Sequence, residues 1–434
     1  MSESVLVIGG GGREHAIARA LAPDCDLYGF ASNRNPGIAS LSVGTETGDE
    51  TDTDGIVDYA ETVGADTAVV GPEASLQAGV ADALNAAGVF TFGPTAEAAR
   101  IETDKAFQRE FMAQHHIPGT PGFETFDDAD AAADYVDKTG DDVAVKPTGL
   151  TGGKGVRVTG DQVTHGEAVE YIRESGHEEW VVEERLVGEE FTVQAFVHDG
   201  DVLPSPAVQD HKRAYEGDEG PNTGGMGSYS DARLTLPFMT ETEYDRAVEI
   251  LEATVDALPE YTGVLYGQFM LTAEGPKVVE FNARFGDPEA MNVLPVLETP
   301  FLDIVDAARE GEALPVPSFR PEATVCKYAV PAGYPTDPDA GAEITVDEST
   351  IEAAAAAHGG EALLFYASID DRDDGLYTTT SRAFAVVGLA DDIATAEAIA
   401  ADALEAAGDG LRVREDVGTA ELVQSRIDHM ERLR

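Results

Sequence analysis

Short apolar runs alternate with stretches of helical character over the first hundred residues of the chain. The first run is followed directly by a predicted helix, and the alternation continues to about residue 100. Short apolar strands that alternate with helices predict a parallel sheet covered on both faces. The expected strands are Val5–Ile8, Asp26–Ala31, Thr67–Val70 and Val89–Phe92, and the expected helices are Glu14–Leu21, Ile56–Val63 and Val80–Ala87.

After residue 103 the pattern becomes dominated by strands. A helix expected near Thr103–His115 ends before Pro118, and Ala273-Glu274-Gly275 later forms the turn between two long strands. We expect an antiparallel, β-rich unit here. Its strands are Val143–Lys146, Val156–Val158, Val181–Glu184 and Phe191–His198, followed by a helix over 245–257 and the strands Gly263–Thr272 and Pro276–Asn282.

The last hundred residues mix short strands with alanine-rich helices. Together with the length of 434 residues, this mixture favours about three domains. The expected strands are Thr324–Val330, Leu363–Ile369 and Ala383–Leu389, and the expected helices are Ser349–Ala357 and Ile393–Ala407.

The charge balance excludes one large class of partners. The chain has 28 basic and 82 acidic residues, a formal charge of -54. Phosphate backbones and anionic membranes need basic surface, so we expect no nucleic acid and no membrane as partners. The acidic residues are spread along the chain, and such a surface resembles that of proteins from salt-loving archaea, where concentrated salt screens self-repulsion.

Cysteine and lysine usage adds two further points. The only cysteines, Cys25 and Cys326, are far apart in the sequence and indicate a reducing compartment. We see no signal peptide and no apolar run long enough to span a membrane, so we expect a cytoplasmic protein. There are only seven lysines against 21 arginines, and five of the seven lysines lie in the motifs described next.

Four glycines, Gly9–Gly12, follow the first strand and open a helix, as in a dinucleotide-binding turn. The dinucleotide fingerprint fails, because its third glycine position falls on Glu14 or His15 and the second strand ends without a carboxylate. The helix N-terminus and Arg13 still suit one phosphate monoester. Gly71-Pro72-Glu73 follows another strand and is expected at the same carboxyl edge of the sheet.

Two segments point to a nucleotide. Lys146 ends a strand and precedes a glycine loop with a second lysine, Lys154, so backbone N–H groups and ammonium charges can meet a polyphosphate. Thirty residues on, two apolar residues and two acidic pairs in 181–190 can form a hinge that binds adenine and ribose.

The strand that ends in Glu280-Phe281-Asn282 carries the candidate metal ligands. Glu280 and Asn282 are two apart and share one face, and a carboxylate with an amide oxygen suits Mg²⁺. Arg284 continues along that face, and Gln268 on the preceding strand can supply another oxygen. A charged cluster, 209–213, followed by the glycine-rich 220–228 fits an acceptor site with a mobile cover.

In order and spacing, Lys105, the loop after Lys146, the hinge at Glu183 and the Glu280 strand resemble the ATP-grasp ligases. Within that superfamily the chain resembles the phosphoribosylamine–glycine ligases from about Val5 to the C-terminal region. The motifs that carry this resemblance are G-G-R-E-H, G-P-E, D-H-K-R, G-P-N-T-G-G-M-G and E-F-N-A-R-F-G-D-P-E.

The resemblance implies an α/β protein of several domains. Residues 1–102 would form a parallel α/β domain, 103–323 an ATP-grasp domain of two α+β subdomains with a mobile part at about 120–190, and 324–434 a small mixed α/β domain. The implied reaction belongs to purine biosynthesis: ATP phosphorylates glycine, and the amine of 5-phosphoribosylamine attacks the acyl phosphate. The family also implies Mg²⁺ or Mn²⁺ and a monomer.

Residue roles follow by matching motifs. The resemblance places ATP at Lys105, Lys146, Gly152, Gly153, Lys154, Gly155, Glu183, Glu184, Leu186 and Glu190, and the metal at Gln268, Glu280 and Asn282. It makes Arg284, Asp210 and Lys212 the catalytic set that faces glycine and the acyl phosphate. The remaining substrate contacts fall on Gly11, Gly12, Arg13, Glu14, Pro72, Glu73, Asn222, Thr223 and Gly224.

The sequence departs from the family pattern in three places. The phosphate loop has Lys-Pro-Thr-Gly-Leu-Thr where many bacterial members have Lys-Ala-Asp-Gly-Leu-Ala. Gln268 stands where other ATP-grasp enzymes often use an acid, and Thr380-Ser381-Arg382 replaces a Gly-Gly-Arg-like turn, to which we assign no role. Three other interpretations stay open: a carboxylase-type or formate-using ATP-grasp enzyme, a nicotinamide-dependent dehydrogenase, and a non-catalytic nucleotide sensor. The intact set Lys105, Lys146, Glu280, Asn282 and Arg284 argues against the sensor.

Overall fold

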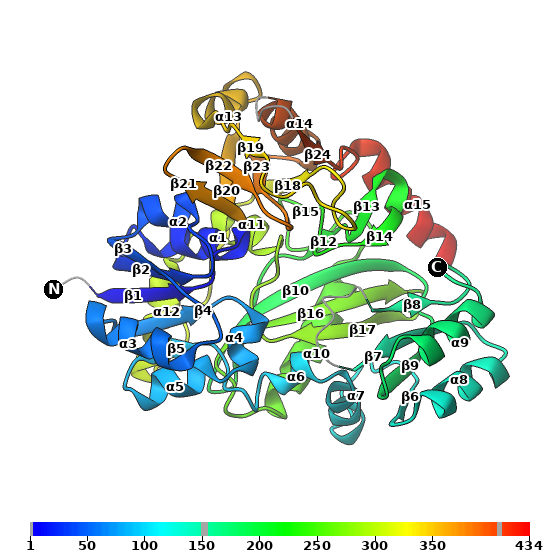
Figure 1. The fold of residues 1–434 in the computed structure, drawn as a ribbon. Coiled ribbons are helices and arrows are strands. Elements are labelled where there is room, and N and C mark those ends of the chain that lie inside the picture. The colour runs from blue at the N-terminus through cyan, green and yellow to red at the C-terminus, as the bar shows by residue number, and fades with distance from the viewer. Residues whose placement is uncertain (1–2, 149–154, 406–409) are drawn as a thin grey trace.

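The N-terminal strands form a parallel sheet with the first strand at its centre. The computed structural model of the chain describes residues 3–148, 155–405 and 410–434 (Figure 1). The five strands lie in the order β3-β2-β1-β4-β5, all parallel, and Val5–Ile8 of β1 is fully buried. The expected parallel sheet is confirmed. Its strands are β1 (Ser4–Ile8), β2 (Asp26–Ala31), β3 (Gly44–Thr47), β4 (Thr67–Val70) and β5 (Phe90–Phe92).

The helices of this region begin and end where local chemistry allows. Helix α3 (Thr53–Val63) starts after Asp52, whose side chain accepts from the Gly55 N–H, and ends at Gly64 in the left-handed conformation. The other helices up to residue 114 are α1 (Gly12–Leu21), α2 (Pro36–Leu41), α4 (Glu73–Gln77), α5 (Val80–Ala86), α6 (Arg100–Thr103) and α7 (Lys105–Gln114).

Residues 123–184 build a small antiparallel sheet with its own core. Its strand order is β6-β9-β7-β8, and helices α8 (Ala129–Lys138) and α9 (His165–Glu174) pack on it. Trp180 is fully buried among side chains of both helices, in a cluster separate from the two larger cores. The strands are β6 (Phe123–Phe126), β7 (Val143–Pro147), β8 (Arg157–Val158) and β9 (Trp180–Glu184).

A ten-stranded sheet runs through the rest of the molecule, with the order β17-β16-β10-β12-β15-β18-β23-β20 and with β11 and β24 paired at its side. The expected antiparallel, β-rich unit is divided between two sheets: Phe191–His198 lies in β10, which pairs with β16 in this large sheet, whereas Val143–Lys146 and Val181–Glu184 lie in the small one. The strands are β10 (Glu189–His198), β11 (Asp201–Pro204), β12 (Val208–Asp210), β15 (Gly227–Ser230), β16 (Gly263–Thr272), β17 (Gly275–Asn282), β18 (Ala323–Pro331), β20 (Glu361–Tyr366), β23 (Phe384–Ala390) and β24 (Leu411–Val413).

The large sheet also joins the C-terminal region to the middle of the chain, because β15 pairs with β18 across the expected boundary at residue 323. The segment expected as one strand, Leu363–Ile369, is broken: β20 ends at Tyr366, and β21 starts at Ile369 in a separate small sheet. The remaining elements are β13 (Arg213–Tyr215), β14 (Glu219–Asn222), β19 (Glu343–Ile344), β21 (Ile369–Arg372), β22 (Gly375–Thr378), α10 (Glu241–Asp256), α11 (Ala290–Val293), α12 (Phe301–Glu310), α13 (Glu348–Ala354), α14 (Ile393–Glu405), α15 (Ala420–Leu433) and the 3-10 turns η1 (Glu216–Asp218), η2 (Leu294–Val296) and η3 (Ala355–Ala357).

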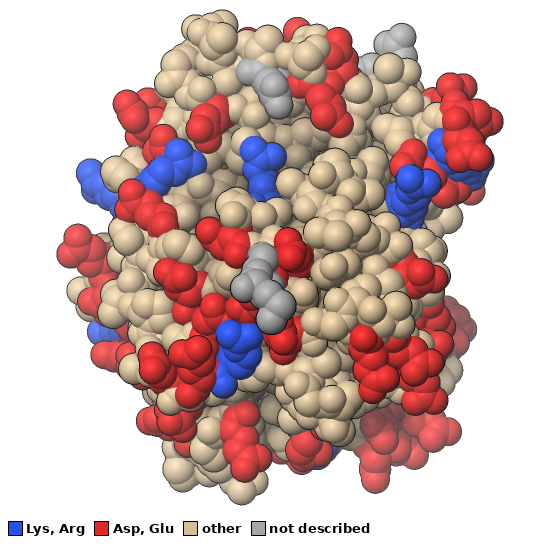
Figure 2. All heavy atoms as spheres, turned by 90° about the vertical axis from the view of Figure 1, so that its left-hand side faces the viewer, with Lys and Arg blue, Asp and Glu red and all other residues tan. Residues whose placement is uncertain are grey.

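The charge of the chain is carried on its surface. Figure 2 shows one face with Asp and Glu side chains spread over it and few Lys or Arg between them. Within the described parts of the chain, no helix is both long and apolar enough to cross a bilayer.

This surface predicts a salt response. We expect the thermal unfolding midpoint to rise by at least about 5 °C between about 0.1 M and about 2 M KCl, because salt screens the repulsion among the carboxylates. Sucrose at equal osmolality is the control, since it stabilises by exclusion without screening. A midpoint that does not respond to KCl, or follows sucrose equally, would contradict the prediction.

Candidate functional site

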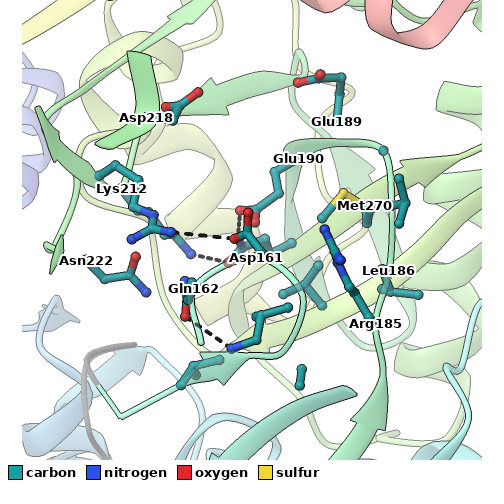
Figure 3. Close-up of a pocket in the computed structure, with 18 of the residues that line it drawn as sticks. Asp161, Gln162, Arg185, Leu186, Glu189, Glu190, Lys212, Asp218, Asn222 and Met270 are labelled. Atoms are coloured by element: carbon teal, nitrogen blue, oxygen red, sulfur yellow. Dashed lines mark hydrogen bonds and ion pairs between the residues drawn. The ribbon is translucent and has the colours of Figure 1, made fainter. Parts of the chain in front are cut away.

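A pocket of about 490 Å³ lies between the small antiparallel sheet and the large sheet (Figure 3). Strands β7 and β9 form one wall, β10, β16 and β17 form the other, and 185–188 connect the two. Helix α15 and the turn before β13 complete the lining. The charged and polar side chains there include Lys146, Glu183, Glu184, Glu190, Asp210, Lys212, Asn222, Gln268 and Glu280, eight of which the sequence placed in the site as ligands of ATP or metal or as catalytic residues.

The pocket contains a buried group of three charges. The Arg109 guanidinium binds both carboxylate oxygens of Glu183, with Nε 2.7 Å from Oε1 and Nη2 3.0 Å from Oε2. The Lys146 Nζ lies 2.8 Å from Glu183 Oε2. Burial works to raise the pKa of Glu183, but attraction to Arg109 and Lys146 outweighs it and holds that pKa below its usual value. Glu183 is therefore ionised, and its role in this geometry is to fix the lysine.

A bulge in the β16–β17 hairpin completes this group. Gln268 pairs with Glu280 but Phe269 pairs with Val278, so Val279 is the extra residue. Its carbonyl accepts from Arg109 Nη2 at 2.7 Å and from Lys146 Nζ at 3.1 Å. Arg109 belongs to none of the motifs in the sequence, so it was not predicted as part of the site. It is an ordinary-looking helix residue, fully buried only because α7 packs here.

The part of the pocket next to the hinge has two apolar side chains and one carboxylate that is held by a hydrogen bond. Leu186 and Met270 line the pocket, as does Glu190, whose Oε2 accepts from Gln268 Nε2 at 2.6 Å (Figure 3). Glu184 is directed toward the edge of the small sheet, where its Oε1 accepts from the Gly122 N–H at 2.9 Å.

The expected metal ligands are next to one another and surrounded by cations. Gln268 and Glu280 are opposite each other on β16 and β17, and the Lys212 ammonium donates to Gln268 Oε1 and lies 3.8 Å from Glu280 Oε1. Burial works to raise the pKa of Glu280, but Lys212, Lys146 and Lys105 outweigh it and lower the pKa. The pKa of Lys105 is also lowered, mainly by burial, and attraction to Glu280 offsets part of this decrease.

This donor set fits Mg²⁺ or Mn²⁺. Glu280 supplies an ionised carboxylate, and Gln268 and Asn282 supply amide oxygens, each of which has two lone pairs and accepts only one described hydrogen bond from a cation. Among the residues the structure describes, no group of three or more His, Cys, Asp or Glu is placed to hold a metal. An ion here would therefore be held by fewer than three such side chains, with amide oxygens as further ligands.

The N-terminal glycine turn meets the end of β17 at a second cluster. The Arg13 Nε donates to Glu14 at 2.6 Å, and Arg13 Nη1 donates to the Phe285 carbonyl at 3.3 Å. Glu14 also accepts from the Gly11 N–H at 2.8 Å. Gly9 has φ +113, and a Cβ there would come within 2.9 Å of both Glu14 and Pro72, so only glycine lets the two loops approach.

Arg284 connects the two clusters. Its Nη2 lies 2.8 Å from Glu102 and donates to Asn282 Oδ1 at 3.3 Å, while its Nε is 3.9 Å from Glu73. Burial lowers the pKa of Arg284, but attraction to carboxylates, first of all that of Glu102, outweighs it and raises the pKa above the usual value. It is therefore a permanent cation between the metal candidates and the N-terminal loops.

The turn to which the sequence assigned no role lies in this second cluster. Arg382 Nη2 is 3.0 Å from Asp287 Oδ2, and its Nη1 donates to the Gly224 carbonyl at 2.6 Å. Tyr328 donates to the other Asp287 oxygen at 2.6 Å. The signal that could have found them was partly visible, because Asp287 belongs to the G-D-P-E motif already linked to the site. Arg382 and Tyr328 carried no such signal, because they belong to the C-terminal region and come next to Asp287 only in the folded protein.

The remaining expected residues fall as follows. Thr223 donates to the Lys212 carbonyl at 2.8 Å, so the start of the glycine-rich loop is tied to the lysine. Asp210 is half-buried, and its buried Oδ1 lacks a partner among the described residues; desolvation, with Glu289 nearby, raises its pKa well above the usual value. The Gly155 carbonyl accepts from Tyr171 at 2.9 Å. Gly152, Gly153 and Lys154 lie outside the described residues.

A small sheet that faces a large sheet across a pocket, with lysines from both walls and a carboxylate–amide pair between them, defines an ATP-grasp ligase. Solved structures agree with this fold. A biotin carboxylase domain of the Hydrogenobacter thermophilus 2-oxoglutarate carboxylase, in complex with MgADP, ADP and bicarbonate, is 15% identical with a TM-score of 0.72 and covers 99% of this chain and 94% of its own.

Sequence comparison is more specific. Models of the N, ATP-grasp (A) and C domains of phosphoribosylglycinamide synthetase match residues 3–102, 103–290 and 324–420. Phosphoribosylamine–glycine ligases of Methanosarcina barkeri and Methanothermobacter thermautotrophicus are 52% and 49% identical, with 99% of each chain covered. That of Thermotoga maritima has a solved structure, 25% identical with a TM-score of 0.78 over 95% of this chain and 99% of its own. The chain belongs to the phosphoribosylamine–glycine ligase family, as its motifs predicted.

Proposed function

We propose that this chain joins glycine to 5-phosphoribosylamine through a glycyl phosphate intermediate: ATP transfers its γ-phosphoryl group to the glycine carboxylate and leaves as ADP, and the amine then displaces phosphate to form the amide. The observation that carries the proposal is Arg284, which binds the metal candidate Asn282 on one side and lies beside Glu73 of the Gly71-Pro72-Glu73 loop and Glu102 on the other. A reaction that transfers a phosphoryl group and then an acyl group needs ATP and the phosphoribosyl substrate held beside one another. Positioned charges can do this without a protein nucleophile.

The nucleotide part of the proposal concerns the pocket. Lys105 and Lys146 would neutralise ATP phosphates, Leu186 and Met270 would border adenine, and Glu190 would accept from the ribose hydroxyls. ATP would be bound with Mg²⁺ or Mn²⁺ on Glu280, Asn282 and Gln268, and the ion would neutralise phosphate oxygens. Lys212, which contacts Gln268 and lies near Glu280, would remain as a further cation beside the transferred phosphoryl group.

The acceptor part concerns the second cluster. Gly11, Gly12, Arg13 and Pro72 would receive the phosphoribosyl group. Asp210 and Arg284 would face glycine and the acyl phosphate. Arg382 would join this set, since it holds Asp287 and the Gly224 carbonyl together. Among the expected contacts, Glu14 and Glu73 would position the arginines, because both lie beside them.

The proposal extends to the setting of the enzyme. Cys25 and Cys326 are free thiols, which supports a reducing, cytoplasmic location. We also propose that the chain works as a monomer, with residues 1–102, 103–323 and 324–434 as its domains and 120–190 as the part that moves over ATP. The separate core of the small sheet supports such a movement.

The decisive assay measures ADP release with phosphoribosylamine, generated in the assay, and either glycine or bicarbonate as co-substrate. We expect ADP and glycinamide ribonucleotide to form in equal amounts with glycine, and ADP release with bicarbonate to stay at background. Release of ADP with bicarbonate alone would instead favour a carboxylase-type enzyme. Omission of phosphoribosylamine is the control for uncoupled ATP hydrolysis.

A further inference from the structure

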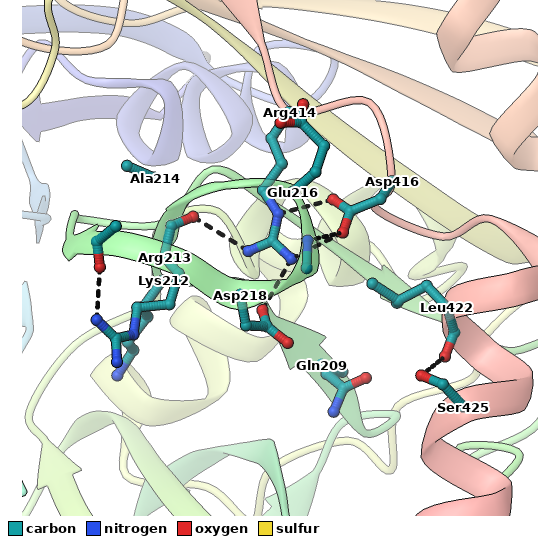
Figure 4. A network of polar contacts seen from close by, with 12 residues as sticks. Gln209, Lys212, Arg213, Ala214, Glu216, Asp218, Arg414, Asp416, Leu422 and Ser425 are labelled. Carbon is teal, nitrogen blue, oxygen red and sulfur yellow. Dashed lines mark hydrogen bonds and ion pairs between the residues drawn. The ribbon is translucent and has the colours of Figure 1, made fainter. Parts of the chain in front are cut away.

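The C-terminal segment is tied to the hairpin that brings Lys212 into the pocket (Figure 4). Arg414 is fully buried, and it donates to the Arg213 carbonyl at 3.1 Å and to Asp218 at 2.8 Å. Asp416 accepts from the Gly217 N–H at 2.9 Å. The β13–β14 hairpin starts directly after Lys212 and ends at Asn222, and residues 412–416 hold its first strand and its turn.

Helix α15 extends these contacts to the opposite side of the pocket. Arg426 and His429 are three residues apart on one face of the helix, and both line the pocket. The Arg426 Nη2 contacts Asp218 on the hairpin, and its Nε lies 3.4 Å from Glu189 Oε2 at the start of β10. The His429 Nδ1 lies 2.5 Å from the other Glu189 oxygen. Arg426 thus bridges the β13–β14 hairpin and the start of β10.

These contacts end at Glu189, which is next to Glu190, the carboxylate proposed to bind the ribose. Glu189 and Glu190 are neighbours on β10, with side chains on opposite faces. Gln209 Nε2 donates to the Glu190 carbonyl at 2.9 Å and is 3.4 Å from Glu189, so the backbone at this point is held by the same group. Gln209 is fixed in turn by Tyr229, which donates to its Oε1 at 2.6 Å.

We propose that Arg426 and His429 are positioning residues for the nucleotide: they hold the strand that carries Glu190 at a set distance from the hairpin that directly follows Lys212. One ATP molecule could then place its ribose hydroxyls at Glu190 and its phosphates near Lys212 at the same time. The inference rests on the proposed function, in which Glu190 binds the ribose. It concerns residues beyond the matched C-domain, which ends at 420.

The test compares Arg426→Met with Arg434→Met in the full chain. Arg434 is the C-cap residue of the same helix and pairs with Glu243 at 2.8 Å, but it does not line the pocket. We expect Arg426→Met to raise the KM for ATP about tenfold with little change in the KM for glycine, and Arg426→Lys to recover part of the loss. Arg434→Met should leave both KM values unchanged. Equal effects of the two Met variants, or an unchanged KM for ATP, would overturn the proposal.

A second readout separates positioning from loss of stability. The preference for ATP over 2′,3′-dideoxy-ATP, taken as the ratio of kcat/KM, should fall in Arg426→Met and in His429→Asn, and should stay in Arg434→Met. Glu190→Gln identifies which proposal fails. If Glu190→Gln keeps the preference, the ribose role of Glu190 is wrong. If Glu190→Gln loses it while Arg426→Met keeps it, only the positioning role is wrong.

Discussion

Replacing Glu280 with glutamine is expected to reduce ADP release about a thousandfold at saturating substrates, a loss of about 4 kcal/mol in transition-state stabilisation. Glu280 is the ionised member of the candidate metal set, and Lys212, Lys146 and Lys105 all lower its pKa. Glutamine keeps the shape and an oxygen but removes the charge. The cation of the nucleotide then has only amide oxygens from these two strands, and the lysines lose the carboxylate that balances them.

The measurement is steady-state ADP release over a range of Mg²⁺ concentrations. Glu274→Gln is the matched control, because Glu274 lies in the exposed turn of the same β16–β17 hairpin and should leave the rate unchanged. Glu280→Gln should also need more Mg²⁺ for half its residual rate. A Glu280→Gln enzyme with the rate and Mg²⁺ requirement of Glu274→Gln would remove Glu280 from the proposed site.

Arg109→Met is expected to destabilise the protein by about 3 kcal/mol, because it leaves the buried Glu183 carboxylate with a single cation. Arg109 and Glu183 are 1% and 4% exposed, so water cannot replace the lost partner. The two backbone carbonyls that accept from Arg109 on the β17 bulge lose a donor as well. The variant should also bind ATP poorly, since Lys146 depends on Glu183 for its position.

Denaturant unfolding checks this expectation, with Arg100→Met as the control. Arg100 lies on the preceding helix and forms an exposed pair with Glu97 at 3.2 Å, and such pairs contribute at most about 1 kcal/mol. The double variant Arg109→Met with Glu183→Leu should regain part of the stability, because it removes the unpaired buried charge. If Arg109→Met were no more destabilising than Arg100→Met, the ion group would have no structural role.

Part of this architecture is visible in local sequence patterns. Strand and helix periods reveal the parallel N-terminal sheet and the β16–β17 hairpin, since each depends on neighbours within a few residues. The two-residue spacing of Glu280 and Asn282 places them on one face for the same reason. Sheet membership is another matter. The pattern of Phe191–His198 predicts a strand in a β-rich region, but only the structure shows that this strand pairs with β16 in the large sheet, because a strand's own pattern does not specify its partner.

The sequence by itself determined the family, the strands and helices that carry its motifs, and the residue types available for phosphates and a metal ion. Tertiary structure alone decided which of them act together. Arg109 and Glu183 are 74 residues apart, and Arg382 and Asp287 are 95 apart. No motif records such pairs. The spacing of a residue along the chain predicts the face of the strand or helix on which its side chain lies. Its partner and its protonation state depend on which residues pack against that face and on how far water is excluded there.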